Sequence, residues 1–205
     1  MKTLKLLTLL ALFIGLSSCS NDDDSPTLLE TESKTITNLA AVQTSDYTTN
    51  PPTISGEFTR FSFASGATTT GNDWDIAFRG TTVLINGGVS QGATNEPNRS
   101  GNGAAYIASG TLAGVVNVDA SLLLQDSASG LAIPTGSDNG WYNYSGHPTH
   151  LITPLAGKVL VIKTNDGKYA KVEILSYYKD GDTSSDSQHY TFSYVYQPNE
   201  GVTTF

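Results

Sequence analysis

The sequence predicts an all-β protein with a single antiparallel domain of many strands, arranged as a β-sandwich or a barrel-like sheet. The chain has 205 residues and 20 glycines, and it lacks runs of Ala, Leu, Glu and Lys at helical spacing. Two apolar, β-branched runs, 158–163 and 169–178, flank Asn165-Asp166-Gly167, which predicts a β-hairpin closed by a type I′ turn. A chain of this length can bury one hydrophobic core.

The other strands are predicted from alternating apolar residues and the turn residues between them. Segment 36–42 fits a strand or a short helix, and the pattern leaves both open, whereas 44–52 is expected to be a loop. Further strands are expected at residues 57–63, 74–78, 82–85, 104–108, 115–118 and 189–197. In the last of these, period-two alternation predicts one buried face that carries Tyr190, Phe192, Tyr194 and Tyr196.

The N-terminus, residues 1–18, is expected to be a lipoprotein signal peptide. Lys2 and Lys5 form a basic region, and the apolar stretch 6–16 is too short to cross a bilayer comfortably. The residues that end at Cys19 resemble the bacterial lipobox, in which the cysteine is lipidated and becomes the mature N-terminus. An ordinary secretory signal with a chance cysteine is the alternative. Each acyl chain contributes about 0.8 kcal/mol per buried CH₂, so the two or three chains of a lipoprotein anchor it firmly to a membrane.

The mature chain is expected to begin with a flexible acidic tether, residues 19–34, followed by the β domain, residues 35–205. Because Cys19 is the only cysteine, the mature domain has neither disulfides nor thiol chemistry and depends on core packing. The net charge is −8, and it becomes more negative once the signal peptide is removed. This charge argues against nucleic acid as a partner, because phosphates would be repelled.

One motif points weakly to catalysis. Residues 88–92 match the G-x-S-x-G pattern of a hydrolase nucleophile elbow, with Ser90 at the centre. That motif requires a sharp turn from a strand into a helix. Residues 93–103 contain Pro97 and several Gly and Asn, so no helix is expected there. We therefore expect a glycine-rich loop without a catalytic role, and a protein that is not an enzyme.

Acidic stretches resemble cation sites only in part. Residues 180–186 carry oxygen ligands at alternating positions but lack the Gly and the closing Glu of a calcium loop, so a polar hairpin connection is expected. Residues 22–24 lack spaced ligands altogether. Asp73 and Asp75 flank Trp74 and would share one strand face as a possible catalytic pair, but we expect this triplet to begin a strand with Trp74 in the core.

The histidines are better candidates for a site. His147 and His150, two of the three histidines, lie on one predicted loop just after Tyr142 and Tyr144. Pro148 biases the residue before it to extended backbone, so the imidazole of His147 is expected to project from an exposed loop. In an extended segment the two Cα atoms would be roughly 10 Å apart, and both rings would approach a metal from one side. One ligand to a metal centre is therefore feasible. The third histidine, at the head of the last strand, is a weaker candidate.

Five motifs occur in an order that is typical of one family. They are DWDIAF at 73–78, the glycine-rich stretch after Asn86, Gly140-Trp141, DGKYAKV at 166–172, and YTFSYVY at 190–196. Together they span about residues 35–198 and resemble the HmuY family of haem-binding lipoproteins. The acidic residues behind Cys19 also resemble the surface-export signal of Bacteroidota lipoproteins. The resemblance implies an all-β fold, lipid attachment to the outer membrane at the cell surface, and haem capture between loops for delivery to an outer-membrane haem transporter.

The iron ligands of the family carry over only in part. One family histidine follows the Gly-Trp motif, at a position next to His147, so the resemblance implies His147 or His150 as an iron ligand. The other family ligand belongs to the segment that corresponds to 119–139, which contains no His and no Met here. Met1 is lost with the signal peptide, so methionine ligation is excluded. A pair of trans ligands on one haem iron is not expected from the histidine loop alone.

Three binding modes remain open. One histidine could hold five-coordinate haem, an aromatic slot could hold a porphyrin by burial, or the fold could bind another ligand such as a glycan or a partner protein. Apart from water, the candidates for the group opposite the histidine are Tyr106, Tyr142 and Tyr144. Candidate partners of the haem propionates, each with an ordinary surface role as the alternative, are Arg79, Arg99 and Lys158. The leading expectation is a surface lipoprotein that binds haem or a related tetrapyrrole for iron acquisition.

Overall fold

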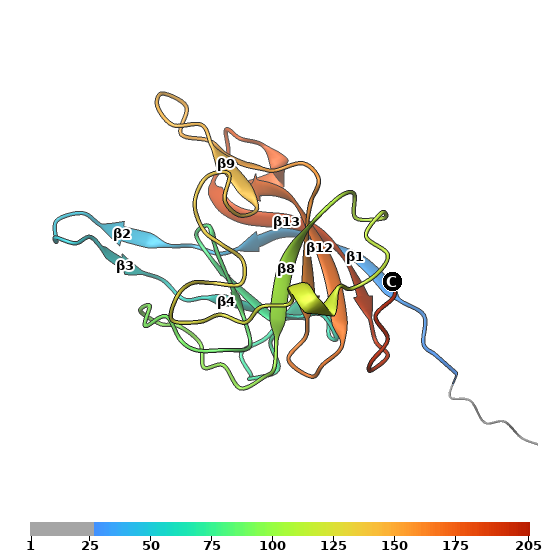
Figure 1. Ribbon diagram of the computed structural model, residues 1–205. Helices are drawn as coiled ribbons and strands as arrows, with labels where there is room; N and C mark the ends of the chain where they lie inside the picture. Colours follow the sequence, from blue (N-terminus) through green and yellow to red (C-terminus); the bar gives the residue numbers. More distant parts are fainter. Residues whose placement is uncertain (1–26) are drawn as a thin grey trace, which may run out of the picture.

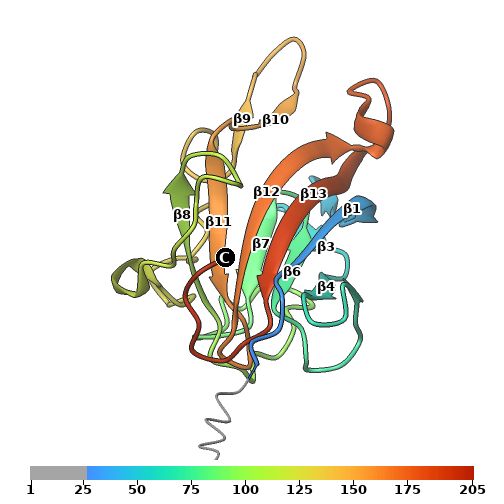
Figure 2. The ribbon, with the colours of Figure 1, turned by 90° about the vertical axis from the view of Figure 1, so that its right-hand side faces the viewer.

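The structure, a computed structural model, describes residues 27–205 (Figures 1 and 2). The signal peptide, Cys19 and the larger part of the expected tether lie outside the described residues. The described chain forms 13 strands and two short 3-10 turns, η1 (Ala120–Leu122) and η2 (Lys179–Gly181). The predicted all-β, antiparallel fold is confirmed. Between residues 27 and 205, no helix has the length and apolar character needed to cross a membrane.

Two larger sheets and two small hairpins make up the domain. The five-stranded sheet contains, in spatial order, β1 (Glu32–Ala40), β13 (Ser187–Gln197), β12 (Tyr169–Tyr178), β11 (Lys158–Lys163) and β8 (Ala104–Ser109). The four-stranded sheet contains β5 (Ala67–Thr68), β4 (Thr59–Ser62), β6 (Ile76–Arg79) and β7 (Thr82–Ile85). The small hairpins pair β2 (Thr44–Asp46) with β3 (Thr53–Ser55), and β9 (Tyr142–Tyr144) with β10 (Ile152–Pro154). Figure 2 shows the four-stranded sheet behind the five-stranded one.

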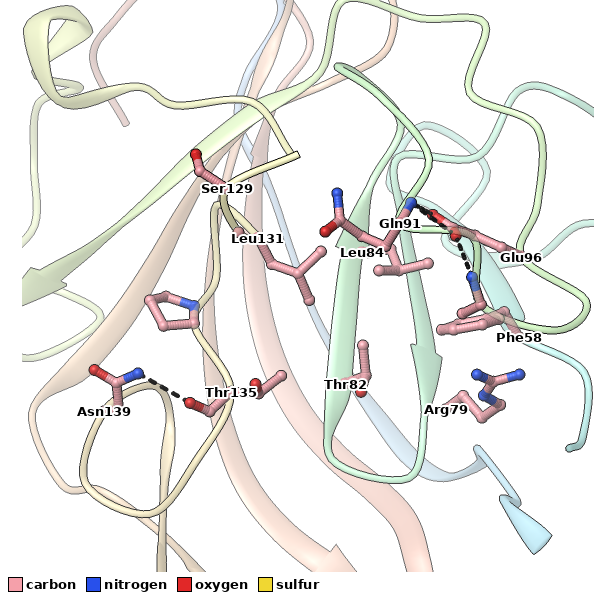
Figure 3. A pocket seen from close by; sticks show the side chains of 13 residues that line it. Phe58, Arg79, Thr82, Leu84, Gln91, Glu96, Ser129, Leu131, Thr135 and Asn139 are labelled. Atoms are coloured by element: carbon pink, nitrogen blue, oxygen red, sulfur yellow. Dashed lines mark hydrogen bonds between the residues drawn. The ribbon is translucent and has the colours of Figure 1, made fainter. Parts of the chain in front are cut away.

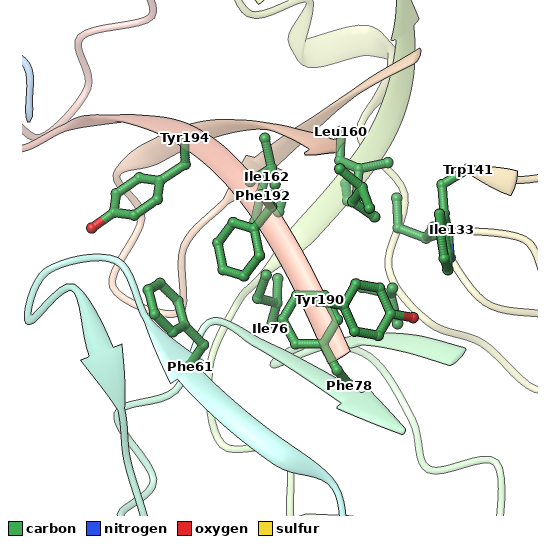
Figure 4. Close-up of a cluster of buried hydrophobic side chains, with 14 of the residues drawn as sticks. Phe61, Ile76, Phe78, Ile133, Trp141, Leu160, Ile162, Tyr190, Phe192 and Tyr194 are labelled. Carbon is green, nitrogen blue, oxygen red and sulfur yellow. The ribbon is translucent and has the colours of Figure 1, made fainter. Parts of the chain in front are cut away.

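The main core lies between the inner faces of these two sheets (Figure 4). The predicted buried face of β13 is confirmed, because every second side chain from Tyr190 to Tyr196 is buried. Phe192 packs edge-on against Phe61 of β4, with ring centroids 5.4 Å apart, and Tyr190 packs on Phe78 of β6 at 4.7 Å. Such aromatic pairs contribute about 0.5–1.5 kcal/mol each beyond their burial, so β13 ties the two sheets together.

Each sheet also has an outer face with its own apolar cluster. The outer face of the five-stranded sheet is covered by the segment after β8 and by the last residues, where Val115, Val118 and Phe205 pack. On the outer face of the four-stranded sheet, Phe58 and Leu84 pack with the fully buried Trp74. The position of Trp74 in a core is confirmed. This second cluster forms one wall of the cavity described below.

Several sequence predictions need correction. The run 115–118 is not a strand but a loop whose valines fill the outer cluster, since a short apolar run fits either structure. The expected loop 44–52 contains β2 and precedes β3, two short strands rich in exposed polar residues. Segment 36–42, for which a strand and a short helix were both open, belongs to strand β1 as far as Ala40. That strand begins at Glu32 and so includes the end of the expected tether.

The hairpin between β11 and β12 is confirmed, but its turn is not type I′. Of the turn residues only Gly167 has positive φ, at +89°, and its N–H donates to the carbonyl of Thr164 at 3.1 Å. The Thr164 N–H in turn donates to the Lys168 carbonyl at 2.9 Å. This is a three-residue loop that ends in a left-handed glycine, the next most common hairpin closure.

A buried carboxylate fastens this turn to the four-stranded sheet. Asp75 accepts hydrogen bonds from the Phe63 N–H at 2.8 Å, the Asn165 N–H at 3.0 Å and the Asn165 side-chain amide at 2.8 Å. Replacement by asparagine leaves one acceptor oxygen and turns an N–H group toward these donors. We expect Asp75→Asn to lower the free energy of unfolding by about 2–3 kcal/mol, as measured by urea denaturation.

The same substitution should show a characteristic pH dependence. Burial raises the pKa of Asp75 above its ordinary 3.8, although its hydrogen bonds oppose the rise. The stability that this group contributes is therefore fully present below pH 3.8 and is lost as the pH rises through the higher folded-state pKa. The difference between the wild type and Asp75→Asn should thus be larger at about pH 4 than at about pH 7. A difference that grows toward neutral pH would contradict this reading.

Candidate binding site

The β9–β10 hairpin carries both loop histidines at one end of the molecule. Both ribbon views show it extending beyond the end of the sheets, opposite the end at which the described chain begins (Figures 1 and 2). Its base is fixed to the domain, because the Leu155 N–H donates to the Trp141 carbonyl at 2.8 Å and the Ile152 N–H to the Tyr178 hydroxyl at 2.9 Å. A rigid base thus presents an exposed tip.

The tip is a tight turn rather than the extended segment expected from Pro148. The His147–Pro148 peptide bond is cis, and the His150 N–H donates to the Gly146 carbonyl at 2.8 Å. The Ser145 hydroxyl closes the turn from inside, where it accepts from the Leu151 N–H at 2.8 Å. Residues 147 and 150 therefore lie much closer together than an extended chain would place them.

The turn brings the two imidazoles face to edge in water. The ring centroids of His147 and His150 lie 5.7 Å apart at an interplanar angle of 82°, and both residues are exposed. The Tyr144 hydroxyl is hydrogen-bonded to Nδ1 of His150. When Nδ1 carries the proton, it donates a hydrogen bond to the hydroxyl oxygen of Tyr144. The lone pair of Nε2 is then free to bind a ligand. A hydrogen bond to the non-ligating nitrogen is what orients histidines that bind metals.

The two tyrosines expected near this site have different surroundings. Tyr144 is 43% exposed beside His150. Tyr142 is buried under the hairpin against Trp141, with ring centroids 4.9 Å apart, and its hydroxyl accepts from the Gly136 N–H at 3.1 Å. Burial also raises the pKa of the neighbouring Tyr177, which keeps that hydroxyl protonated. The structure thus groups Tyr144 with the histidines and places Tyr142 in the support beneath them.

The other candidates lie apart from this hairpin. Tyr106 is buried in the outer cluster of the five-stranded sheet, where its hydroxyl accepts from the Asp119 N–H at 2.9 Å. His189 Nδ1 bonds the Ser187 carbonyl at 2.9 Å near the start of β13. Lys158 is half-buried at the start of β11.

Neither arginine has the surface role considered for it. Arg99 is buried in ion pairs with Asp126, at 2.8 Å, and with Glu96. Arg79 is buried on the outer face of the four-stranded sheet. Sequence reasoning missed this burial, because an isolated arginine in a polar loop or at a strand end carries no pattern that distinguishes the two environments.

The remaining motifs are structural in this fold. The Ser90 hydroxyl donates to the Glu96 carboxylate at 2.9 Å, and no helix follows it, as predicted. Segment 180–186 is the polar connection between β12 and β13, in which Asp182 accepts from the Ser184 N–H at 2.8 Å. In the described part of the chain, no three His, Cys, Asp or Glu side chains gather in a way that could hold a metal ion.

A cavity of about 590 Å³ lies away from the histidines. Segment 127–139, part of the stretch that corresponds to the second family ligand, forms one wall, and the outer face of β6 and β7 forms the other (Figure 3). None of the three histidines lines it. The exposed hairpin tip and this cavity are therefore two separate candidate sites.

Known protein families and solved structures both give matches to this chain. The family described as HmuY protein matches residues 33–194, which is most of the chain. No curated protein matches the sequence. Among solved structures, a presumed lipoprotein of Bacteroides fragilis is 14% identical, with a TM-score of 0.49 over 84% of this chain and 94% of the other. A presumed HmuY-like heme-binding protein of Bacteroides vulgatus is 18% identical, with a TM-score of 0.48 over 82% and 93%. The apo HmuY analog of Tannerella forsythia is 18% identical, with a TM-score of 0.44 over 84% and 99%.

Proposed function

Because this chain belongs to the HmuY family, we propose that it is a surface lipoprotein that binds haem, or a related tetrapyrrole, for iron acquisition. The pair of exposed imidazoles at the tip of the β9–β10 hairpin is the observation that locates the proposed binding site. Imidazole nitrogen is a common axial ligand of haem iron. Membership in a family of haem-binding proteins and an accessible imidazole with an oriented ring support the same function.

His150 is the axial ligand in this proposal. Its Nδ1 is held by the Tyr144 hydroxyl, so Nε2 points away from that bond and is available to iron. The partly exposed ring of Tyr144 offers an apolar surface beside the porphyrin, and His147 lies next to the iron-binding imidazole. Both histidines come from the same short turn, so the haem is five-coordinate or carries water on its other side.

The position of the hairpin suits uptake and delivery. The tip lies at the end opposite to the start of the described chain (Figure 2). If Cys19 carries the lipid anchor, as the sequence predicts, the hairpin faces away from the membrane. A haem bound there would remain accessible to an outer-membrane haem transporter, the partner that the family resemblance implies.

Titration of the protein with haemin tests the proposal. We expect a shifted and sharpened Soret band that saturates at one haem per chain, with the spectrum of a high-spin, histidine-ligated haem. A spectrum that stays that of free haemin at micromolar protein and haemin would reject haem binding. The alternative from the sequence, a glycan or a partner protein, would then be the remaining function of this fold.

A further inference from the structure

The cavity on the outer face of the four-stranded sheet has the size and lining of a small-molecule site. Its volume of about 590 Å³ lies within the usual range of roughly 300–1,000 Å³ for such sites. Phe58, Leu84 and Leu131 provide apolar surface from both walls (Figure 3). Thr82 and Asn139 add polar groups to the lining. An apolar body with one polar group would match this lining.

The apolar surface follows from strand alternation. On β6 and β7 the inward side chains fill the main core, so Ala77 and Leu84 face outward and pack with Trp74 and Phe58. No third sheet covers this face. The chain around Leu131 and the loop around Ala93 pack against this face, and the space that they leave open is the cavity.

A buried cation lines the same cavity. Arg79 is only 5% exposed and stacks on Phe58, with the guanidinium carbon 4.0 Å from the ring centroid. Both of its hydrogen bonds come from Nη1, to the carbonyls of Gly56, at 3.1 Å, and Thr94. Its Nε has no hydrogen-bond partner. The edge formed by Nε and Nη2 thus makes no hydrogen bond within the described chain, and once it turns toward the cavity it can bind a planar carboxylate through two parallel hydrogen bonds.

The charge of Arg79 has no direct counter-ion within residues 27–205. Glu96 also lines the cavity, but its carboxylate is occupied by Arg99 and accepts from the Ser90 hydroxyl and the Gln91 and Ala93 N–H groups. Burial lowers the pKa of Arg79, and the charges of Glu96 and Glu57 oppose this only in part. A buried cation without a partner is costly, and an anionic ligand would remove that cost.

We propose that this cavity binds a small organic acid, with its carboxylate on Arg79 and its apolar or aromatic body between Leu84 and Leu131. One cation and a mainly apolar lining suit a monocarboxylate better than a strongly hydrated phosphate. The site is separate from the hairpin histidines, so it is a second function of the domain and does not depend on haem binding.

The test compares an acid with its neutral isostere. Indole-3-acetate and indole-3-acetamide are titrated into the protein by isothermal calorimetry. We expect the acid to bind at least about tenfold more tightly than the amide, because only the acid forms the charge-assisted pair with Arg79. Equal affinities, or no binding of the acid at about 1 mM, would overturn the proposal.

Variants locate the binding. Leu131→Trp fills the cavity without a change of charge and should abolish acid binding, whereas Leu122→Trp, at an exposed position in η1, should leave it unchanged. Arg79→Lys keeps the charge but loses the two-donor edge, so the acid should bind at least about fivefold more weakly. Undiminished binding to Leu131→Trp would place the acid elsewhere and refute the site. Folding of each variant is checked by urea denaturation.

A competition experiment separates this site from the proposed haem site. Haemin and indole-3-acetate should bind at the same time, and His150→Ala should leave acid affinity unchanged. Displacement of the acid by haemin would mean that the cavity belongs to the haem site and would overturn the proposal of a second site. Failure of haem binding with retained acid binding would reject only the proposed function.

Discussion

Replacement of Arg99 by leucine should lower the free energy of unfolding by about 4 kcal/mol. The arginine side chain is 3% exposed, and it pairs with Asp126 at 2.8 Å and with Glu96 while its Nε donates to the Ile85 carbonyl at 3.1 Å. Removal of this one cation leaves two buried carboxylates without their partner, a change that typically costs about 3–5 kcal/mol. Urea denaturation at neutral pH measures the difference.

The same chain offers a matched control. Arg60→Leu makes the identical replacement at a partly exposed residue of β4 whose guanidinium donates to the Gly71 carbonyl at 2.9 Å. We expect a loss of about 1 kcal/mol or less there. If the two variants were equally destabilised, the Arg99 network would not hold the loops around Glu96 and Asp126 to the end of β7.

The second large effect concerns haem. His150→Ala should weaken haemin binding by about a hundredfold and remove the shifted Soret band, because it removes the proposed axial ligand. Tyr144→Phe keeps the ligand but loses the hydrogen bond to Nδ1, so we expect a loss of about tenfold. His147→Ala should have an effect of similar size to that of Tyr144→Phe, through lost contact beside the iron.

His189→Ala is the control for this series. That histidine is bound to the Ser187 carbonyl and lies outside the hairpin, so haemin affinity should not change. If His189→Ala weakened binding as strongly as His150→Ala, or if His150→Ala had no effect, the hairpin tip would not be the haem site.

Sequence patterns predicted the fold where strands are long and half-buried. The predicted bounds of β7, β11 and β12 agree with the structure, because their apolar runs end at turn residues. Strands of only two or three residues, such as β2, β5 and β9, are too short to show such a pattern, and tertiary contacts decide their structure.

The sequence indicated which residue types form the candidate site, but it did not indicate how they are arranged. Pro148 indicated an exposed histidine loop, but the turn that brings His147 to His150 depends on backbone geometry that the sequence does not specify. The burial of Arg79 had no sequence signal at all, because it depends on Gly56, Phe58 and Thr94, which are distant from it in the chain. For the same reason the cavity itself could not be predicted.

The most direct test of the proposed haem site is to locate a bound porphyrin by NMR. Gallium(III) protoporphyrin IX is diamagnetic, so amide shifts in a ¹H–¹⁵N spectrum report its contacts without paramagnetic broadening. We predict that the largest shifts fall on residues 144–151 at the hairpin tip, with Leu84 and Leu131 of the cavity unaffected. Shifts confined to the cavity, or no shifts at a saturating porphyrin concentration, would contradict haem capture by this hairpin.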